Sequence, residues 1–253
     1  MRSKKIWIIL LLVITSLALT ACAAEPGFTA PGVSLNIEPA GQPKQVVTGV
    51  QLLVLLTVLS LAPSILVLMT SFTRIIIVLS MLRSAIGTPT IPPNQVVVGL
   101  SLLLTIFIMA PVYGQIDQQA IQPYLKGEIT QEAAFTKAMD PLREFMFKQT
   151  REKDLQLFLD MGKTPQPTKL ADVPTLTLFP AFVISELRTA FTMGFIIYIP
   201  FLVIDMVVSS ILLSMGMMML PPSLISLPFK ILLFVMVDGW YLIARSLALS
   251  FTG

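Results

Sequence analysis

Long runs without charge constrain this chain more than any other feature of its sequence. Residues 45–73 carry no charged side chain over 29 positions, and residues 84–116 carry none over 33. About 20 apolar residues in a helix are enough to cross the hydrocarbon core of a bilayer. Only 12% of the residues are charged, against about 25% in ordinary soluble domains. The sequence therefore predicts a membrane or membrane-assembled protein built from apolar helices.

The N-terminal 23 residues have the three parts of a secretory signal peptide. Basic residues at positions 2, 4 and 5 precede an apolar stretch from Ile6 to Leu19, and small residues follow. The four residues that end at Cys22 also match a lipoprotein cleavage box. Two interpretations remain open, which are ordinary cleavage after Ala23 or Ala24 and lipidation of Cys22. In either case we expect the mature N-terminus to lie outside the cytoplasmic membrane.

The residue types that are missing exclude several kinds of chemistry. Histidine is absent and Cys22 is the only cysteine, which excludes His-based catalysis, His/Cys metal sites and disulfide frameworks. An intramembrane aspartyl protease would need two facing aspartates, and neither Asp205 nor Asp238 lies in the Gly-x-Gly-Asp setting of such enzymes. Without the leader, basic and acidic residues balance at 14 each. We predict a protein that is not an enzyme, binds no cofactor and has no nucleic-acid partner.

Charge and proline content divide the chain into five predicted segments. Residues 24–45 are rich in Pro and Gly, and residues 117–180 hold nine acidic and eight basic side chains. We therefore predict a cleaved leader at 1–23, an extracytoplasmic linker at 24–45, hydrophobic helices at 46–116, an extracytoplasmic helical domain at 117–180, and hydrophobic helical hairpins at 181–253.

Local signals predict where some of these helices begin and end. A helix from Asn94 to about Tyr113 fits the second uncharged run. Thr130 is a helix cap, and Asp140 followed by a proline has the pattern of another helix start. Gly162 is expected to end that helix. These signals make the segment 117–180 a small set of amphipathic helices whose apolar face packs internally or against another subunit.

The C-terminal third is apolar, but its uncharged runs are short. Sixteen residues separate Arg188 from Asp205, and 15 separate Asp205 from Pro221. Fifteen helical residues span about 22 Å, less than the hydrocarbon core of about 30 Å. We therefore expect kinked helices and hairpins that are buried against protein, and an all-α fold overall.

Charged residues in apolar surroundings are costly unless they are paired. The eight in this chain are Arg74, Arg83, Glu186, Arg188, Asp205, Lys230, Asp238 and Arg245. Two interpretations are open. The acids can pair with bases, in which case removal of one partner strands the other charge. Alternatively, Glu186, Asp205 and Asp238 form a proton relay. The structural interpretation is favoured because the bases outnumber the acids.

Four methionines gather just before a double proline, at positions 215 and 217–219. Methionine is flexible and polarizable, so it fills irregular gaps and adapts to variable partners. On a helix, Met215, Met218 and Met219 would lie on one side. That side is either ordinary core or, in a ring of identical subunits, a soft closure of a central hole.

Several segments of the chain resemble the FliP family, the flagellar export-gate proteins related to the SctR proteins of injectisomes. The resemblance covers about residues 46–253, and one departure is Thr192 in the first signature. The leader and the soluble insert favour the flagellar branch. The resembling segments are PAFVISELRTAFTMGF at 180–195, PFLVIDMVVSS at 200–210, TSFTRIIIVLS at 70–80, PPNQV at 92–96, LPFKI at 227–231 and VDGW at 237–240.

The resemblance implies roles for particular residues. Met217, Met218 and Met219 match a loop implied to form a gasket around a channel. Glu186 and Lys230 match a salt bridge implied to join neighbouring subunits. Phe145 and Phe158 match aromatic positions of the extracytoplasmic domain that are implied to support self-assembly.

The resemblance also implies a function, a location and a set of partners. It implies a pore-forming subunit of the flagellar type III export gate in the bacterial inner membrane, within the flagellar basal body, that passes unfolded flagellar subunits. The alternatives are a proton or ion channel component and a non-conducting assembly scaffold. The implied partners are about five copies of the chain, FliQ, FliR, FlhB, FlhA and the unfolded export substrates.

Overall fold

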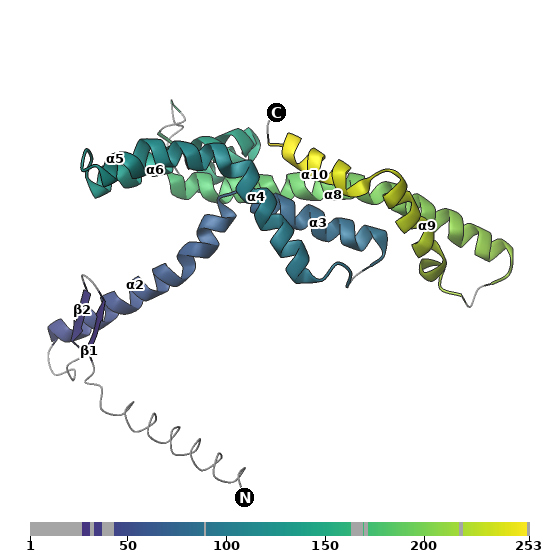
Figure 1. Cartoon of the computed structure of the whole chain (residues 1–253), viewed down its shortest axis with the longest axis horizontal. Helices are drawn as coiled ribbons and strands as arrows, with labels where there is room; N and C mark the ends of the chain where they lie inside the picture. The colour runs from purple at the N-terminus through teal and green to yellow at the C-terminus, as the bar shows by residue number, and fades with distance from the viewer. Residues whose placement is uncertain are drawn as a thin grey trace, which may run out of the picture. The chain divides into compact units, whose positions relative to one another are not determined.

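The structure is a computed structural model that describes residues 27–30, 33–36, 43–88, 90–162, 169, 172–217 and 220–251. The chain divides into two compact units, Met1–Ser60 and Leu61–Gly253. The predicted signal peptide and Cys22 lie outside the described residues. Each unit is described by itself below (Figure 1).

The described secondary structure is almost entirely helical, which confirms the predicted all-α class. Its elements are β1 (Gly27–Ala30), β2 (Val33–Asn36), α2 (Pro43–Leu68), α3 (Phe72–Ile86), α4 (Asn94–Ile116), the π-helix η2 (Asp117–Ile121), α5 (Gln122–Leu125), α6 (Gln131–Gln149), α7 (Glu152–Met161), α8 (Thr175–Ser214), α9 (Pro222–Met236) and α10 (Gly239–Leu249).

The first unit contains a small hairpin and most of α2. Strands β1 and β2 pair antiparallel, with Gly27 opposite Asn36 and Ala30 opposite Val33. Both strands lie inside the segment predicted as a linker, and α2 begins at Pro43 rather than at residue 46. Proline at the first helical position is favourable because its missing N–H has no partner there in any case.

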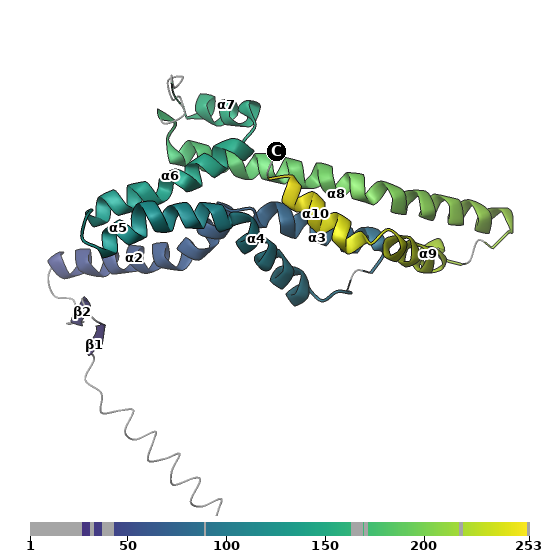
Figure 2. The same ribbon diagram turned by 45° about the horizontal axis from the view of Figure 1, so that its top comes forward.

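Helix α8 is the element on which the second unit is built. It lies beside α3, carries α6 and α7 on its N-terminal part, and is followed by α9, which folds back along it (Figure 2). One apolar core joins α3, α8, α9 and α10 and includes Val78, Leu82, Phe201 and Leu247. A second core joins α6 to α8. Buried apolar surface from four separate helices therefore holds α8 in place.

Helix α8 is longer than the uncharged runs from which kinked helices and hairpins were predicted. It runs through 40 residues without a break, past Pro180, Pro200 and both acidic residues. The length estimate treated Arg188 and Asp205 as ends of apolar runs. The helix continues instead because Glu186 and Asp205 find basic partners on neighbouring helices, so neither carboxylate has to leave the apolar region.

Two predicted helix boundaries also differ from the structure. Asp140 does not start a helix, since α6 begins at Gln131 and passes through Pro141. Pro141 is buried there, which shows that tertiary packing outweighs the local start signal. The helix predicted to end at about Tyr113 continues instead, in helical structure that runs from Asn94 to Leu125. The predicted cap at Thr130 is confirmed, because its side chain accepts a hydrogen bond from the Ala133 N–H.

Two helical stretches among the described residues, Asn94–Leu125 and Thr175–Ser214, are long and apolar enough to cross a membrane. A third span is possible by the same measure if α9 and α10 count as one, although they meet at a bend of 63°. Length and composition support these spans, and no bilayer position follows from them.

Candidate functional site

A buried ion pair between Arg74 and Glu186 lies between α3 and α8. The two side chains are 3% and 0% exposed. Arg74 Nε donates a hydrogen bond to Glu186 Oε2 at 2.9 Å, and Arg74 Nη2 donates to Oε1. Two hydrogen bonds of this kind set the orientation of the guanidinium as well as neutralising its charge. The two helices are therefore joined by a matched pair rather than by an isolated buried charge.

The other donors of Arg74 hold the C-terminal end of the chain. Nη1 donates to the carbonyl oxygen and the hydroxyl of Ser250 at 2.9 and 3.0 Å, and Nη2 donates to Gln149 Oε1 at 2.8 Å. A guanidinium has five N–H donors, and each of the five has an acceptor here. The Phe251 ring lies 3.9 Å from the guanidinium carbon, in cation–π contact. We call Arg74, Gln149, Glu186, Ser250 and Phe251 the Arg74 cluster.

A second ion pair closes the hairpin of α8 and α9. Lys230 Nζ donates to Asp205 Oδ2 at 2.6 Å, and the Ser226 hydroxyl donates to Asp205 Oδ1 at 2.5 Å. Lys230 and Ser226 are buried, whereas the Asp205 side chain is 33% exposed. The carboxylate therefore has a partner for each oxygen and still faces the surroundings.

The remaining predicted charges have different environments. Half-buried Arg83 donates from Nη1 to Asn94 Oδ1 at 2.6 Å, which ties the end of α3 to the start of α4. Arg188, Asp238 and Arg245 are exposed in the single chain. Their burial would need contacts with another chain and stays a prediction about the assembled protein.

The structure does not bring Glu186 and Lys230 together. Within the chain each has another partner, Arg74 for Glu186 and Asp205 for Lys230. A bridge between Glu186 and Lys230 of neighbouring subunits stays a prediction, because one chain shows no contact between copies. Such a bridge would have to compete with two ion pairs that already satisfy both residues.

The turn between α8 and α9 contains the methionines. Helix α8 ends at Ser214, Gly216 has a φ of 73°, and α9 begins after Pro221. The chain reverses there, so the hairpin carries this turn at its tip (Figure 1). Met215 is 63% exposed and Met217 is half-buried, while Met218 and Met219 lie outside the described residues. The sealing role of the three methionines stays a prediction.

Phe145 and Phe158, the two predicted self-assembly residues, lie in different surroundings. Phe145 is buried on α6, with its ring centroid 5.9 Å from that of Phe182 and 6.1 Å from that of Phe251. Phe158 on α7 is half-buried. Phe145 therefore packs inside the chain, at the junction of α6, α8 and the C-terminal residues. A part in self-assembly stays a prediction for both.

Sequence reasoning missed the polar partners of the two ion pairs. Ser226 precedes Lys230 by four residues on a helix, so its place on the same face had a readable signal. Gln149 and Ser250 had none, because they lie 75 and 176 positions from Arg74. Only the tertiary arrangement of the chain brings them to the guanidinium.

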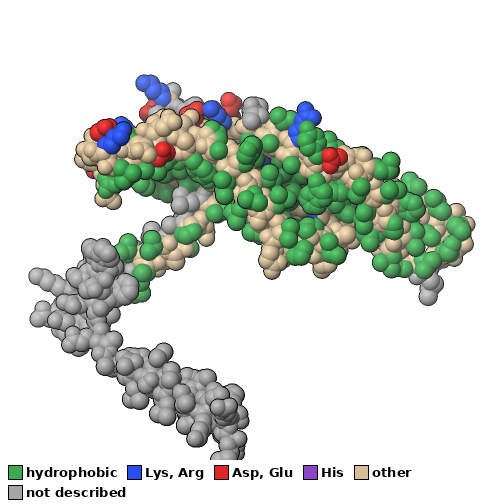
Figure 3. Space-filling view, in the orientation of Figure 1, with side chains coloured by type: hydrophobic (Ala, Val, Ile, Leu, Met, Phe, Trp, Pro, Cys, Tyr) green, Lys and Arg blue, Asp and Glu red, His purple; other side chains and the backbone are tan. Residues whose placement is uncertain are grey.

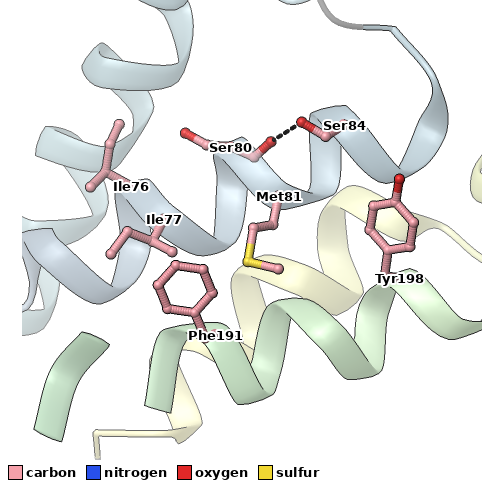
Figure 4. Close-up of a pocket in the computed structure, with 7 residues that line it drawn as sticks. All are labelled: Ile76, Ile77, Ser80, Met81, Ser84, Phe191 and Tyr198. Atoms are coloured by element: carbon pink, nitrogen blue, oxygen red, sulfur yellow. Dashed lines mark hydrogen bonds between the residues drawn. The ribbon is translucent and has the colours of Figure 1, made fainter. Parts of the chain in front are cut away.

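A shallow groove runs between α3 and α8 on the outside of the second unit. Its lining is apolar apart from three hydroxyl groups (Figure 4). Gly194 lets the two helices approach closely beside it, since a Cβ there would lie 2.4 Å from the Met81 sulfur. The groove residues are Ile76, Ile77, Ser80, Met81, Ser84, Phe191 and Tyr198.

The groove and its surroundings offer binding surface rather than reactive groups. Tyr198 contributes the single titratable side chain of the groove lining. Among the residues that the structure describes, no three His, Cys, Asp or Glu side chains are placed to hold a metal ion. The chemistry of the described residues is therefore pairing and packing.

A family model described as the FliP family matches residues 55–247. The match runs from within α2 to within α10 and includes both ion pairs and the tip of the hairpin. The chain belongs to the FliP family. As a FliP-family protein with apolar helices of spanning length, it is a membrane protein of flagellar biosynthesis.

Curated relatives cover nearly all of this FliP-family chain. It is 58% identical over 217 residues to the flagellar biosynthetic protein FliP of Bacillus subtilis (strain 168), which covers 86% of the chain and 98% of the relative. It is 47% identical over 239 residues to the protein of the same name from Aquifex aeolicus (strain VF5), which covers 92% and 98%. The FliP protein of Pectobacterium carotovorum is 52% identical over 221 residues, covering 87% and 85%.

The segments that first suggested the FliP family supply both ion pairs. Segment 70–80 contributes Arg74, and segment 180–195 contributes its partner Glu186. Segments 200–210 and 227–231 contribute Asp205 and Lys230 in the same way. Two stretches of α8 in this FliP-family protein are thus each joined by an ion pair to a neighbouring helix, α3 for Glu186 and α9 for Asp205.

Proposed function

We propose that the chain is a pore-forming subunit of the flagellar type III protein export gate, through which unfolded flagellar subunits cross the cytoplasmic membrane. The observation that carries the proposal is membership of the FliP family, whose curated relatives are named flagellar biosynthetic proteins. We propose assembly of about five copies with FliQ and FliR, next to FlhB and FlhA. The N-terminus and residues 117–180 would lie outside the inner membrane.

The surface of the second unit supports a subunit that is completed by others. Helices α8 and α9 expose large apolar side chains, among them Met206, Leu213, Phe229 and Val235. On the face seen in Figure 3, apolar side chains cover the end formed by α8 and α9, and charged side chains lie mostly around α5 and α6. Apolar surface of this extent marks contacts with protein or lipid.

The hairpin of α8 and α9 is suited to carry a gate at its tip. The Asp205–Lys230 pair and Ser226 hold the two helices together behind the turn. Because these contacts fix the two helices relative to each other, the turn keeps a constant position at the end of the hairpin. The methionines of the turn supply deformable apolar side chains. Copies arranged around an axis would close a narrow opening with these side chains and reshape around a passing polypeptide.

Deletion of the gene tests the proposed function as a whole. Cells that lack the chain should release no flagellar subunits into the medium, and expression of the chain should restore release. The assembly of FliQ and FliR, measured by co-purification, separates the alternatives. A scaffold would be required for that assembly alone, whereas point variants of a pore subunit can block export and leave the assembly intact.

Replacement of Met217, Met218 and Met219 by alanine is expected to raise the leak of small ions through the assembled gate. Alanine removes the flexible apolar volume proposed to close the opening. Ion flux into vesicles that contain the complex measures the leak, and co-purification of FliQ and FliR checks assembly.

Leucine at the same three positions is the matched control, because it keeps the volume but not the flexibility. Its leak should be smaller than that of the alanine variant. If the alanine variant leaked no more than the unmodified gate, the three methionines would not seal the opening.

In the rival interpretation, Asp205 is a conducting carboxylate of an ion or proton channel. The partial exposure of the Asp205 side chain is the observation in favour of this interpretation. A charge exchange separates the two. Asp205→Lys and Lys230→Asp should each abolish most export, since each leaves two like charges side by side. The double variant should recover part of the export if the pair is structural. Failure of the double variant, together with activity of Lys230→Ala, would favour the channel.

A further inference from the structure

Helices α9 and α10 meet at an unfavourable bend. The bend of 63° falls on Val237 and Asp238, and Asp238 has φ 50° and ψ 56°. It is the one non-glycine residue with a positive φ in the described part of the chain. A Cβ is disfavoured in this left-handed region, although aspartate tolerates it better than most residues. The Asp238 side chain makes no capping hydrogen bond to α10 that would offset the strain.

Glycine at position 239 suits the bent form, whereas it would destabilise a straight, continuous helix. A Cβ at Gly239 would lie 2.2 Å from the Phe234 ring, so the bend needs glycine there. In a continuous helix, positions 234 and 239 lie roughly 140° apart around the axis and do not touch. Glycine inside a helix is unfavourable compared with alanine. Asp238 therefore disfavours the bent form and Gly239 disfavours the straight form, so the two conformations are closer in free energy.

Helix α10 packs Ile243 and Leu247 into the apolar core and places the Trp240 ring against Phe234 of α9, with the two ring centroids 5.4 Å apart. Only Gly239, Ile243 and Leu247 of its residues are buried, while Trp240 and Tyr241 are 47% and 58% exposed. A further attachment follows the helix, where the Arg74 cluster binds Ser250 and covers Phe251. Helix α9 is attached separately, through Lys230 to Asp205 on α8.

We propose that the α9–α10 bend is a conformational latch that the Arg74 cluster holds closed. When Ser250 and Phe251 leave Arg74, α10 swings outward, Asp238 returns to the right-handed region, and α9 and α10 join as one helix. In the released state Arg74 keeps Glu186 and Gln149 as partners, so no charge is stranded. The cost of release is the loss of the two Nη1 hydrogen bonds to Ser250 and of the core packing of Ile243 and Leu247. The latch does not rest on the export function, since it concerns one chain.

Distances between two spin labels on the full chain test the latch. Ser246→Cys on α10 and Lys148→Cys on α6 are exposed sites on either side of the cluster, in a Cys22→Ser background. Labelled chains are diluted with unlabelled ones so that each distance lies within one copy. Straightening by 63° moves position 246 by roughly 10 Å at 1.5 Å rise per residue.

The unmodified chain should show mostly the short distance, and Gly239→Ala should add a population that is longer by roughly 10 Å. Alanine cannot be placed in the bent form but suits the straight helix. Gly99→Ala is the matched control, because nothing lies within 4 Å of a Cβ at that helical glycine. It should leave the distances unchanged.

Three further variants keep the test decisive if Gly239→Ala fails to accumulate. Asp238→Val places a β-branched residue in the left-handed region and should add the longer population, whereas Asp238→Gly should keep only the short one. The Ser250→Ala, Phe251→Ala double variant should also lengthen the distance. If Asp238→Val and this double variant both give only the short distance, the latch does not exist.

Discussion

Glu186→Ala is expected to lower the free energy of unfolding by about 3–5 kcal/mol, because it strands the buried guanidinium of Arg74. The partner side chain is 3% exposed, so water cannot replace the lost carboxylate. For a domain of this size each kcal/mol shifts the melting temperature by about 2–4 °C. We therefore expect a drop of roughly 10 °C in detergent, measured by thermal unfolding.

The exposed pair of Lys148 and Glu144 is the matched control for this prediction. Its side chains are 68% and 60% exposed, and such a pair contributes about 0.5 kcal/mol at most. Glu144→Ala should therefore leave the melting temperature nearly unchanged. If Glu186→Ala were equally harmless, the Arg74 cluster would not stabilise the fold. Arg74→Met combined with Glu186→Met should recover part of the loss, because it removes both charges together.

Phe145→Ala is expected to destabilise the single chain by about 3–5 kcal/mol, as is usual for a buried phenylalanine. Its ring packs against Phe182 and Phe251, so a cavity would open where α6, α8 and the C-terminal residues meet. The measurement is the free energy of unfolding of the chain at a concentration too low for self-association.

Phe158→Ala and Phe135→Ala are graded controls for the cavity at Phe145. Phe158 is half-buried and should lose less stability, and Phe135 is 69% exposed and should lose almost none. If Phe145→Ala reduced self-assembly while leaving the unfolding free energy intact, its ring would act between subunits rather than inside one. We expect Phe145→Ala to lower the free energy of unfolding of the single chain, with any loss of assembly following from that lower stability.

The helical class and the pairing of charges could be predicted because both depend on composition and local pattern. Uncharged runs longer than a bilayer span indicate helices, and an excess of bases over acids in apolar surroundings indicates pairing. The Thr130 cap was readable for the same reason. Each of these signals lies within a few neighbouring residues.

The partners of the charges could not be predicted from spacing. Glu186 pairs with Arg74, which lies 112 positions away, and not with Lys230. Kinked helices and hairpins were predicted for this part of the chain, but not that α8 continues unbroken through Asp205, whose partner Lys230 lies on α9. Asp140 failed as a helix start because Pro141 is buried in the interior of α6.

The sequence by itself determined that this chain is a helical membrane protein, that its apolar segments contain charged residues, and which family it belongs to. Only the tertiary structure decided which charge meets which, that α8 is one uninterrupted helix, and that Arg74 holds the C-terminal end. The physical reason is that helix formation and burial follow from each residue and its near neighbours. An ion pair between distant helices depends on how those helices pack, and packing is a property of the whole chain.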